Sequence, residues 1–438
     1  MELVPCTISY IEFAEQYLKE NRPCLIDQEL TASWKARKLW QKGGKPFLEY
    51  LKKEFGESQV PVTDCNDIQF SSHPKQTWSF AAYIDYWRQY NISLYSSSDK
   101  HTEKRQLYLK DWHFTRDYPN YGLYTTPHVF SIDWLNEVWD QESPGAEDHH
   151  QVKDDYRFVY MGPKGTWTPF HVDVFRSYSW SVNVCGLKEW LIYPPGEEKH
   201  LRDKYGNLPL DVTGTELQDT SMYPNAHKAI KPLHVIQGIG QAIFVPSGWH
   251  HQVKNLEDTI SINHNWTNGF GIAYTWKYLK TELILVEKEI DDCRSMEGWS
   301  EQCQVILRSD AGMNINDFYH FILKIIHPRL ERLKKLTEAS KQESKTVFYG
   351  SFDQELFCET PRKGEISFLM SLLPQDIASS ISLPAFKADE KQLSLLHLLF
   401  ELCEASKILT EMMSQYTEHC PRTDNDSLVD IKKLLLNE

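Results

Sequence analysis

The chain has 438 residues, of which 41% are apolar and 25% are charged. This composition can bury a sizeable core and allows two or three domains. The 47 Lys and Arg against 61 Asp and Glu give a net charge of −14. Because phosphate contacts need clustered Lys and Arg, this balance argues against direct nucleic-acid binding and suits a basic protein partner better.

The sequence shows no signal for export or membrane insertion. Residues 1–20 lack the basic segment and apolar run of a signal peptide, and no stretch approaches the ~20 apolar residues of a membrane-spanning helix. The nine Cys are dispersed from Cys6 to Cys420 without CxxC pairs, a usage typical of reduced thiols. We therefore expect an intracellular protein, in the cytoplasm or the nucleus, with no membrane partner.

The first part of the chain, residues 1–145, should form an α/β region. Apolar periodicity predicts a helix near 10–20, and short apolar runs predict strands over 23–27 and 107–114. An acidic stretch with Pro and Gly at 141–155 marks the end of this region.

Residues 146–272 change to short apolar runs between turn residues, at 156–162, 179–186, 188–195, 241–248 and 258–266. Short strands divided by Gly and Pro are typical of an antiparallel barrel or a double-sheet jelly roll. Over 273–438 the apolar residues recur at steps of three and four, which predicts a helical region. The expected fold class is therefore α+β with a mainly β core.

The segment 166–195 carries the strongest chemical signal. His171 and Asp173 lie two residues apart, and on a strand this spacing points both side chains to one face. A second imidazole from a distant strand would complete the two-His, one-carboxylate set that holds non-haem iron with open positions. His250 and His251 follow a Pro-Ser-Gly turn, and strand alternation lets only one of them face the metal.

Lys188 adds a second signal. A His-x-Asp pair by itself is weak evidence for a metal site. In this sequence, however, His171 is the only one of the 17 His that is followed by Asp two residues later. Lys188 lies in a run that otherwise predicts a buried strand, between the His-x-Asp pair and the second His pair. A buried ammonium needs an anionic partner, which a dicarboxylate cosubstrate would supply. The alternative is an edge-strand Lys that faces water.

These segments resemble the JmjC family of iron(II)- and 2-oxoglutarate-dependent oxygenases over most of residues 150–270. The motifs that carry the resemblance are KDWH (110–113), SIDWLNEVWD (131–140), FRSYSWSVNVCG (175–186) and VPSGWHHQVKNLEDTISINHNW (245–266). The resemblance implies a double-stranded β-helix, which is a cupin-like jelly-roll barrel, with N-terminal α/β elements and a C-terminal helical region. It also implies Fe(II), 2-oxoglutarate and O2 as cofactors, with ascorbate in assays.

Matched position by position, the resemblance makes His171, Asp173 and His251 the metal ligands and the catalytic centre. Many relatives have a β-branched residue two positions after the distal His, and His251 fits this spacing. His250 does not fit it and stays the alternative.

The resemblance also implies a cosubstrate pocket. Lys188 falls where relatives carry a Lys that pairs with the distal carboxylate of 2-oxoglutarate, and Thr168 falls where a hydroxyl assists that Lys. Asn265 falls where an amide lines the metal pocket. Ser181 stands where some relatives have Asn and completes the expected set.

The resemblance is strongest to small JmjC hydroxylases that lack chromatin-reader modules. It implies oxidative decarboxylation of 2-oxoglutarate, coupled to hydroxylation of a lysine side chain in the eukaryotic translation termination (release) factor. The alternatives are an N-methyl-lysine demethylase and a catalytically inactive barrel that acts as a binding module. A cupin-like metalloenzyme without 2-oxoglutarate would not need Lys188. The apolar stripe at 391–413 predicts either internal packing or a homodimer interface.

Overall fold

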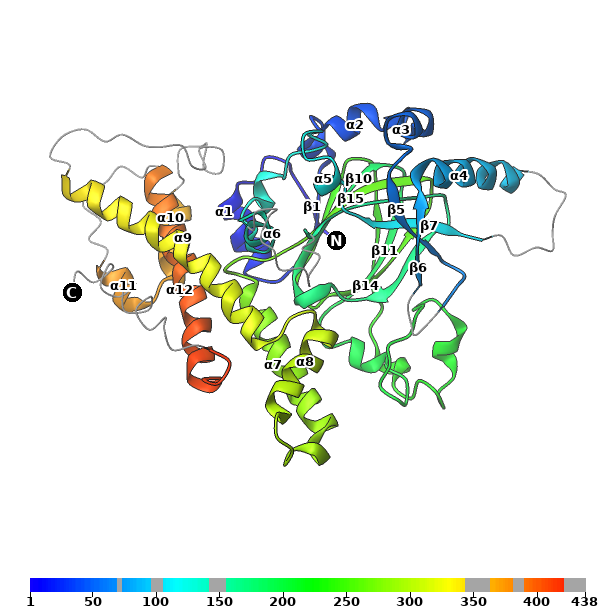
Figure 1. Cartoon of the computed structure of the whole chain (residues 1–438). Helices are drawn as coiled ribbons and strands as arrows, with labels where there is room; N and C mark the ends of the chain where they lie inside the picture. Colours follow the sequence, from blue (N-terminus) through cyan, green and yellow to red (C-terminus); the bar gives the residue numbers. More distant parts are fainter. Residues whose placement is uncertain (69–72, 96–104, 142–154, 343–362, 381–389, 421–438) are drawn as a thin grey trace.

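The computed structural model describes residues 1–68, 73–95, 105–141, 155–342, 363–380 and 390–420. Two sheets form a barrel at the centre of the molecule (Figure 1). The larger sheet has the strand order β1 (Leu3–Val4), β2 (Cys24–Ile26), β13 (Ala242–Val245), β10 (Tyr178–Cys185), β15 (Thr259–Trp266), β8 (Arg157–Gly162), β7 (Leu107–Trp112), β5 (Gln59–Asp64) and β6 (Lys75–Ser79). The smaller sheet has the order β12 (Leu233–Gln237), β11 (Lys188–Tyr193), β14 (His250–Asn255) and β9 (Trp167–His171).

Helices flank the barrel on its outside (Figure 1). The N-terminal ones are α1 (Tyr10–Phe13), α2 (Lys35–Leu39), α3 (Leu48–Phe55), α4 (Phe80–Tyr95), α5 (Phe114–Asp117) and α6 (Trp134–Gln141). The C-terminal ones are α7 (Ile272–Glu289), α8 (Trp299–Ala311), α9 (Ile315–Gln342), α10 (Lys363–Leu372), α11 (Gln375–Ser380) and α12 (Glu390–Gln415). A short hairpin joins β3 (Gln41–Lys42) and β4 (Lys45–Pro46).

The predicted strands of the middle region are confirmed. The five apolar runs form β8, β10, β11, β13 and β15, and apart from the parallel β1–β2 pair the described pairings are antiparallel. The mainly β, jelly-roll core that the sequence predicts is therefore correct.

The N-terminal region supplies strands to the barrel as well as helices. The predicted helix near 10–20 is α1 followed by a turn of π-helix, and Ser9 and Glu12 cap it by reciprocal side-chain to backbone bonds of 3.1 Å. β7 pairs with β8 and β2 pairs with β13. This region therefore extends the larger sheet. The predicted boundary at 145/146 lies outside the described residues.

The C-terminal region is helical, as predicted, and its last long helix is buried within the chain. The inward side chains of α12 include Leu399, Leu402 and Leu409, and the helix packs against α7, α9 and α10. From residue 394 on, the described apolar side chains of this stripe are thus largely covered within the chain. A homodimer through the C-terminal helices stays a prediction. Among the described helices, none is long and apolar enough to cross a membrane.

Candidate active site

The structure brings together His171, Asp173 and His251, and one ligand atom from each lies within 4.8 Å of the others. His171 ends β9 and His251 is the second residue of β14. These strands are paired with His171 directly opposite His251, and the ring centroids are 4.3 Å apart. The two imidazoles therefore meet because two strands of the smaller sheet lie side by side.

Both imidazoles are held in the same tautomer. The Nδ1 of His171 lies 2.7 Å from the Pro169 carbonyl oxygen, and the Nδ1 of His251 lies 3.0 Å from the Trp249 carbonyl oxygen. A carbonyl only accepts, so each Nδ1 carries the proton and each Nε2 keeps a free lone pair. Burial, with the nearby His251, lowers the pKa of His171 to about 3, which keeps this ring neutral.

Asp173 lies just beyond the end of β9, at the start of a short 3-10 turn (Val174–Arg176). Its Oδ2 accepts a hydrogen bond from Ser179 Oγ at 2.7 Å, and its Oδ1 accepts one from Asn265 Nδ2 at 2.9 Å. Asn265 was expected to line the metal pocket, and in the structure it orients the carboxylate. Ser179 was not predicted.

A strained turn returns the chain from Asp173 to β10. Phe175 and Arg176 have φ angles of 56° and 55°, which are rare for residues other than glycine. Ser247 Oγ donates a hydrogen bond of 2.5 Å to the Arg176 carbonyl oxygen. This reversal brings Ser179 back to Asp173, and strain at a turn of this kind is common at functional sites.

The two adjacent histidines of β14 face opposite sides of the smaller sheet. His250 packs against Phe170, with ring centroids 5.6 Å apart and the rings tilted by 35°, next to a small apolar cluster of Phe170, Tyr193 and Leu201. His251 faces His171. The geometry therefore favours His251 over His250 as the third member of the constellation.

Lys188 is 2% exposed and lies at the start of β11. Its Nζ donates a hydrogen bond of 2.7 Å to Ser261 Oγ, and no carboxylate of the described residues forms an ion pair with it. Burial, with the nearby charge of Lys110, lowers the pKa of Lys188 to about 7. The expected buried position is correct, and the edge-strand alternative is wrong.

A polar stripe connects the two ends of this site. Alternation along β10 and β15 gives their inward faces small polar side chains, which are Ser179, Ser181, Asn183, Ser261, Asn263 and Asn265. The intervening residues, such as Trp180 and Ile262, pack in the main apolar core. Ser or Asn at every second position of both strands is the sequence signal that could have identified this polar face.

Ser181 and Thr168 were both predicted to contact a cosubstrate. Ser181 is buried, and its Oγ makes no hydrogen bond in the described part of the chain. Thr168 is half-buried on β9, opposite Val253 of β14.

The donor set suits a divalent transition metal, because two neutral imidazoles and one carboxylate leave several coordination positions open. The unpaired ammonium of Lys188 and the orphan hydroxyl of Ser181 suit a carboxylate. The residues therefore fit a metal ion together with a small dicarboxylate.

The fold and this site define the cupin-like class, and a family model described as "Cupin-like domain" matches residues 11–272. Similar proteins include the "2-oxoglutarate and iron-dependent oxygenase JMJD4" of Gallus gallus, 41% identical over 98% of this chain and 89% of the relative. The protein of the same name from Homo sapiens is 44% identical, covering 89% of this chain and 88% of its own length. The "Arginine-specific demethylase JMJ20" of Arabidopsis thaliana is 40% identical over 76% of this chain and 71% of its own length. The chain belongs to the cupin-like JmjC family, in the group of the JMJD4 oxygenases.

Proposed function

We propose that the chain is an Fe(II)- and 2-oxoglutarate-dependent protein hydroxylase that acts on a lysine side chain of the eukaryotic translation termination factor. One observation carries the enzyme class. Lys188 is a buried ammonium that pairs with no carboxylate of the described residues, and it lies at the far end of a polar stripe that begins at Asp173. A metal centre and a separate buried cation are what a cosubstrate with two carboxylates needs.

In this proposal His171, Asp173 and His251 hold iron(II), with both imidazoles binding through Nε2. Bound iron(II), with 2-oxoglutarate and O2, supplies the oxidation of an unactivated C–H bond. The chain supplies position: Ser179 and Asn265 orient the carboxylate of Asp173.

The cosubstrate pocket in this proposal is closed at its far end by Lys188. Its ammonium neutralises the distal carboxylate of 2-oxoglutarate, and Ser261 orients it. Thr168 and Ser181 offer hydroxyls beside the same molecule. The buried walls exclude water from the reacting groups.

The proposal of a lysine substrate rests on the family resemblance and on the net charge of the chain. A net charge of −14 favours docking of a basic segment, and the dispersed Cys give no zinc-binding reader module. Action on a translation factor would place the protein in the cytoplasm. The JMJ20 relative is named a demethylase, so oxidation of an N-methyl group is the second candidate, because it needs the same site.

The test is succinate formation by the purified protein with iron(II), ascorbate and 2-oxoglutarate, with and without the termination factor. Substrate-stimulated succinate, together with a lysine peptide that gains one oxygen atom, supports the proposal. Stimulation with loss of a methyl group from a methylated lysine would move the protein to the demethylases. The Asp173→Ala variant should lose turnover and keep the fold, and a wild-type protein that binds neither iron nor cosubstrate would be a binding module.

A further inference from the structure

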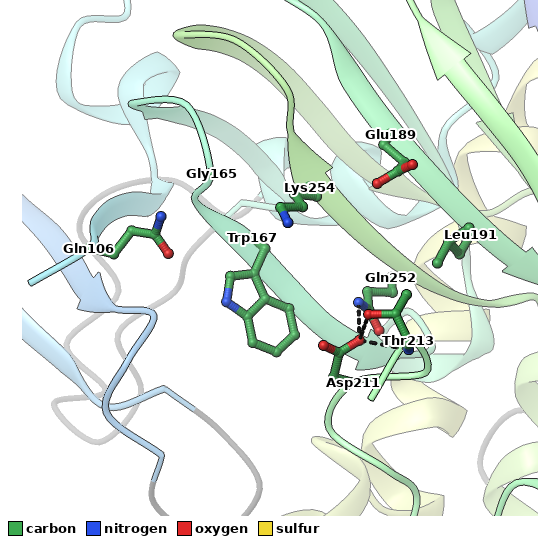
Figure 2. Close-up of a pocket in the computed structure, with 9 residues that line it drawn as sticks. All are labelled: Gln106, Gly165, Trp167, Glu189, Leu191, Asp211, Thr213, Gln252 and Lys254. Atoms are coloured by element: carbon green, nitrogen blue, oxygen red, sulfur yellow. Dashed lines mark hydrogen bonds between the residues drawn. The ribbon is translucent and has the colours of Figure 1, made fainter. Parts of the chain in front are cut away.

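Figure 2 shows a pocket on the smaller sheet. Its lining residues Gln252 and Lys254 alternate along β14 with His251 and Val253, so the pocket lies on the opposite face of the sheet from the metal constellation. Its volume is about 280 Å³, which is large enough for a side chain or two and small for a cofactor. The residues that line it are Gln106, Gly165, Trp167, Glu189, Leu191, Asp211, Thr213, Gln252 and Lys254.

Hydrogen bonds connect the segment that carries Asp211 to two strands of the smaller sheet. The Phe170 N–H of β9 donates to the Leu210 carbonyl oxygen at 2.9 Å. Gln252 of β14 makes two further bonds: its Oε1 accepts from the Val212 N–H at 2.8 Å, and its Nε2 donates to Asp211 Oδ1 at 2.7 Å. The position of the Asp211 carboxylate is therefore fixed by both strands.

The two oxygens of Asp211 are used differently. Oδ1 accepts three hydrogen bonds, from the Thr213 N–H (2.8 Å), the Thr213 hydroxyl (2.7 Å) and Gln252 Nε2 (2.7 Å). Among the described residues no hydrogen bond uses Oδ2, and Figure 2 shows this oxygen pointing away from those partners, on the side of Trp167. Burial opposes ionisation, but the bonds from Thr213 and Gln252 hold the pKa of Asp211 below its ordinary value.

Among the lining residues, Glu189 and Asp211 carry carboxylates and Lys254 carries an ammonium. Lys254 lies directly opposite Glu189 on the neighbouring strand, and its charge also contributes to the lowered pKa of Asp211. The Glu189 carboxylate bonds His234 Nε2 at 2.7 Å. The free oxygen of Asp211 and the half-buried indole of Trp167 line the same pocket (Figure 2). A carboxylate and an aromatic ring that line one small pocket can together attract an organic cation.

We propose that this pocket binds a lysine or arginine side chain of the protein substrate, between the Asp211 carboxylate and the Trp167 ring. The proposal rests on the proposed protein hydroxylase function. The pocket and the metal constellation share β9, where Trp167 and His171 are four residues or about 13 Å apart. A basic residue several positions from the target residue would thus dock here and hold the peptide in register.

The test uses the full chain and a fluorescent peptide of alternating arginine and glycine, which offers cations but no target lysine. Binding is measured by fluorescence anisotropy at low salt. Asp211→Asn keeps an oxygen for the three internal hydrogen bonds, but it removes the charge and replaces the free oxygen with an NH2 group, so we expect about tenfold weaker binding. Glu216→Gln is the matched control, because it changes the net charge equally on the same exposed loop but outside the pocket. Equal affinity of the two variants would overturn the proposal.

A second measurement separates this proposal from the proposed function. With the termination factor as substrate, Asp211→Asn should raise KM and leave kcat and the substrate-free formation of succinate unchanged. Loss of substrate-free succinate would mean a structural role and would count against the pocket. If the wild-type protein does not turn over the termination factor at all, the proposed function fails, and the peptide binding alone decides whether the pocket is a cation site.

Discussion

Asp173 keeps its carboxylate oriented through two side chains on neighbouring strands. Ser179 of β10 and Asn265 of β15 each donate to one of its oxygens, while backbone carbonyls set the tautomers of His171 and His251. At the scale of the residue, groups that are not themselves proposed as ligands thus orient the three proposed ligands. Loss of such a partner lowers metal affinity by roughly ten- to hundredfold.

Ser179→Ala should weaken metal binding about tenfold, because Asp173 Oδ2 loses its only side-chain donor among the described residues. Titration with manganese(II), without cosubstrate, measures the affinity. Ser181→Ala is the control, since it lies on the same face of β10 and makes no hydrogen bond to Asp173. A metal affinity that is the same in both variants would contradict the assigned role of Ser179.

The cosubstrate affinity should depend on pH through Lys188. Burial lowers its pKa to about 7, and only the protonated ammonium attracts a carboxylate. Binding of 2-oxoglutarate to the manganese(II) protein should therefore weaken roughly eightfold from about pH 6.5 to about pH 8, with proton uptake at the higher pH. Calorimetry in buffers of different ionisation enthalpy measures both quantities.

Lys188→Met gives the control for this pH dependence, and its weaker binding should be nearly flat over the same range. A wild-type affinity that does not change with pH would mean that Lys188 stays charged without a cosubstrate.

The lowered pKa of Lys188 also affects the stability of the fold. A Lys in the unfolded chain has a pKa of about 10.4, so between about pH 7 and that value the unfolded chain binds more protons than the folded chain. The free energy of unfolding of the free protein should therefore rise with pH over this range.

At the scale of the element, five strands of the barrel were predictable from apolar runs, and the pairing of the strands was not. Turn residues and apolar runs located β8, β10, β11, β13 and β15 correctly. The pairing of β7 with β8 and of β2 with β13 depends on contacts far apart in the sequence, which local patterns do not encode. The same holds for the left-handed backbone at Phe175 and Arg176, since neither residue type favours it.

The candidate site was predictable as far as residue chemistry and spacing reach. His171, Asp173 and Lys188 stood out in the sequence, and the resemblance selected His251. Spacing on a strand did not explain Asp173, because β9 ends at His171 and a turn carries the carboxylate. The Ser and Asn partners could be found only from their alternation along two strands, since each one by itself is a common small polar residue.

A buried ionic cluster links three helices, and we expect it to contribute to the free energy of unfolding. Arg329 of α9 forms two bonds of 2.9 Å to Glu137 of α6 and one of 3.2 Å to Glu401 of α12. Arg329→Met leaves Glu401, which is 5% exposed, without its arginine partner, so that His397 at 3.6 Å is the remaining basic group of the described residues beside it. We expect a loss of about 3–5 kcal/mol in the free energy of unfolding, measured in urea.

The control for Arg329→Met is Arg308→Met. Arg308 pairs with Asp317 across a more exposed surface, so its loss should cost less than ~1 kcal/mol. Equal destabilisation by the two substitutions would contradict the cluster's role in joining the helices.

At the scale of the whole molecule, the C-terminal helices and the barrel share one core. A single buried cluster contains Val4 at the chain start, Trp180 and Trp266 in the barrel, Trp276 of α7 and Leu409 of α12. The cupin-like match ends at residue 272, but the core continues beyond it. The predicted division at 272/273 therefore marks a change of sequence pattern and not the end of the core. Apolar side chains from both sides of it are buried in one cluster.

The contacts between α12 and the rest of the chain are specific as well as apolar. Phe400 lies 4.4 Å from Phe270, between ring centroids, just after the last barrel strand. Tyr10 Oη lies 3.0 Å from His397 Nε2, which joins α12 to the first helix. These contacts place the end of the described chain against its beginning.

Removal of residues 273–438 should therefore prevent the barrel from folding, although it leaves every strand in place. The truncation would uncover apolar side chains that lie against these helices, among them Phe270 beside Phe400, Phe175 beside Gly312 and Trp134 beside Arg329. We expect the exposed apolar area to cost more than the marginal stability of a domain. Circular dichroism and limited proteolysis measure the outcome. A chain that ends at 420 keeps every described helix and should fold normally. A truncated protein that stays soluble, binds manganese(II) and resists protease would show that the barrel is independent, and that the C-terminal helices pack on it without stabilising it.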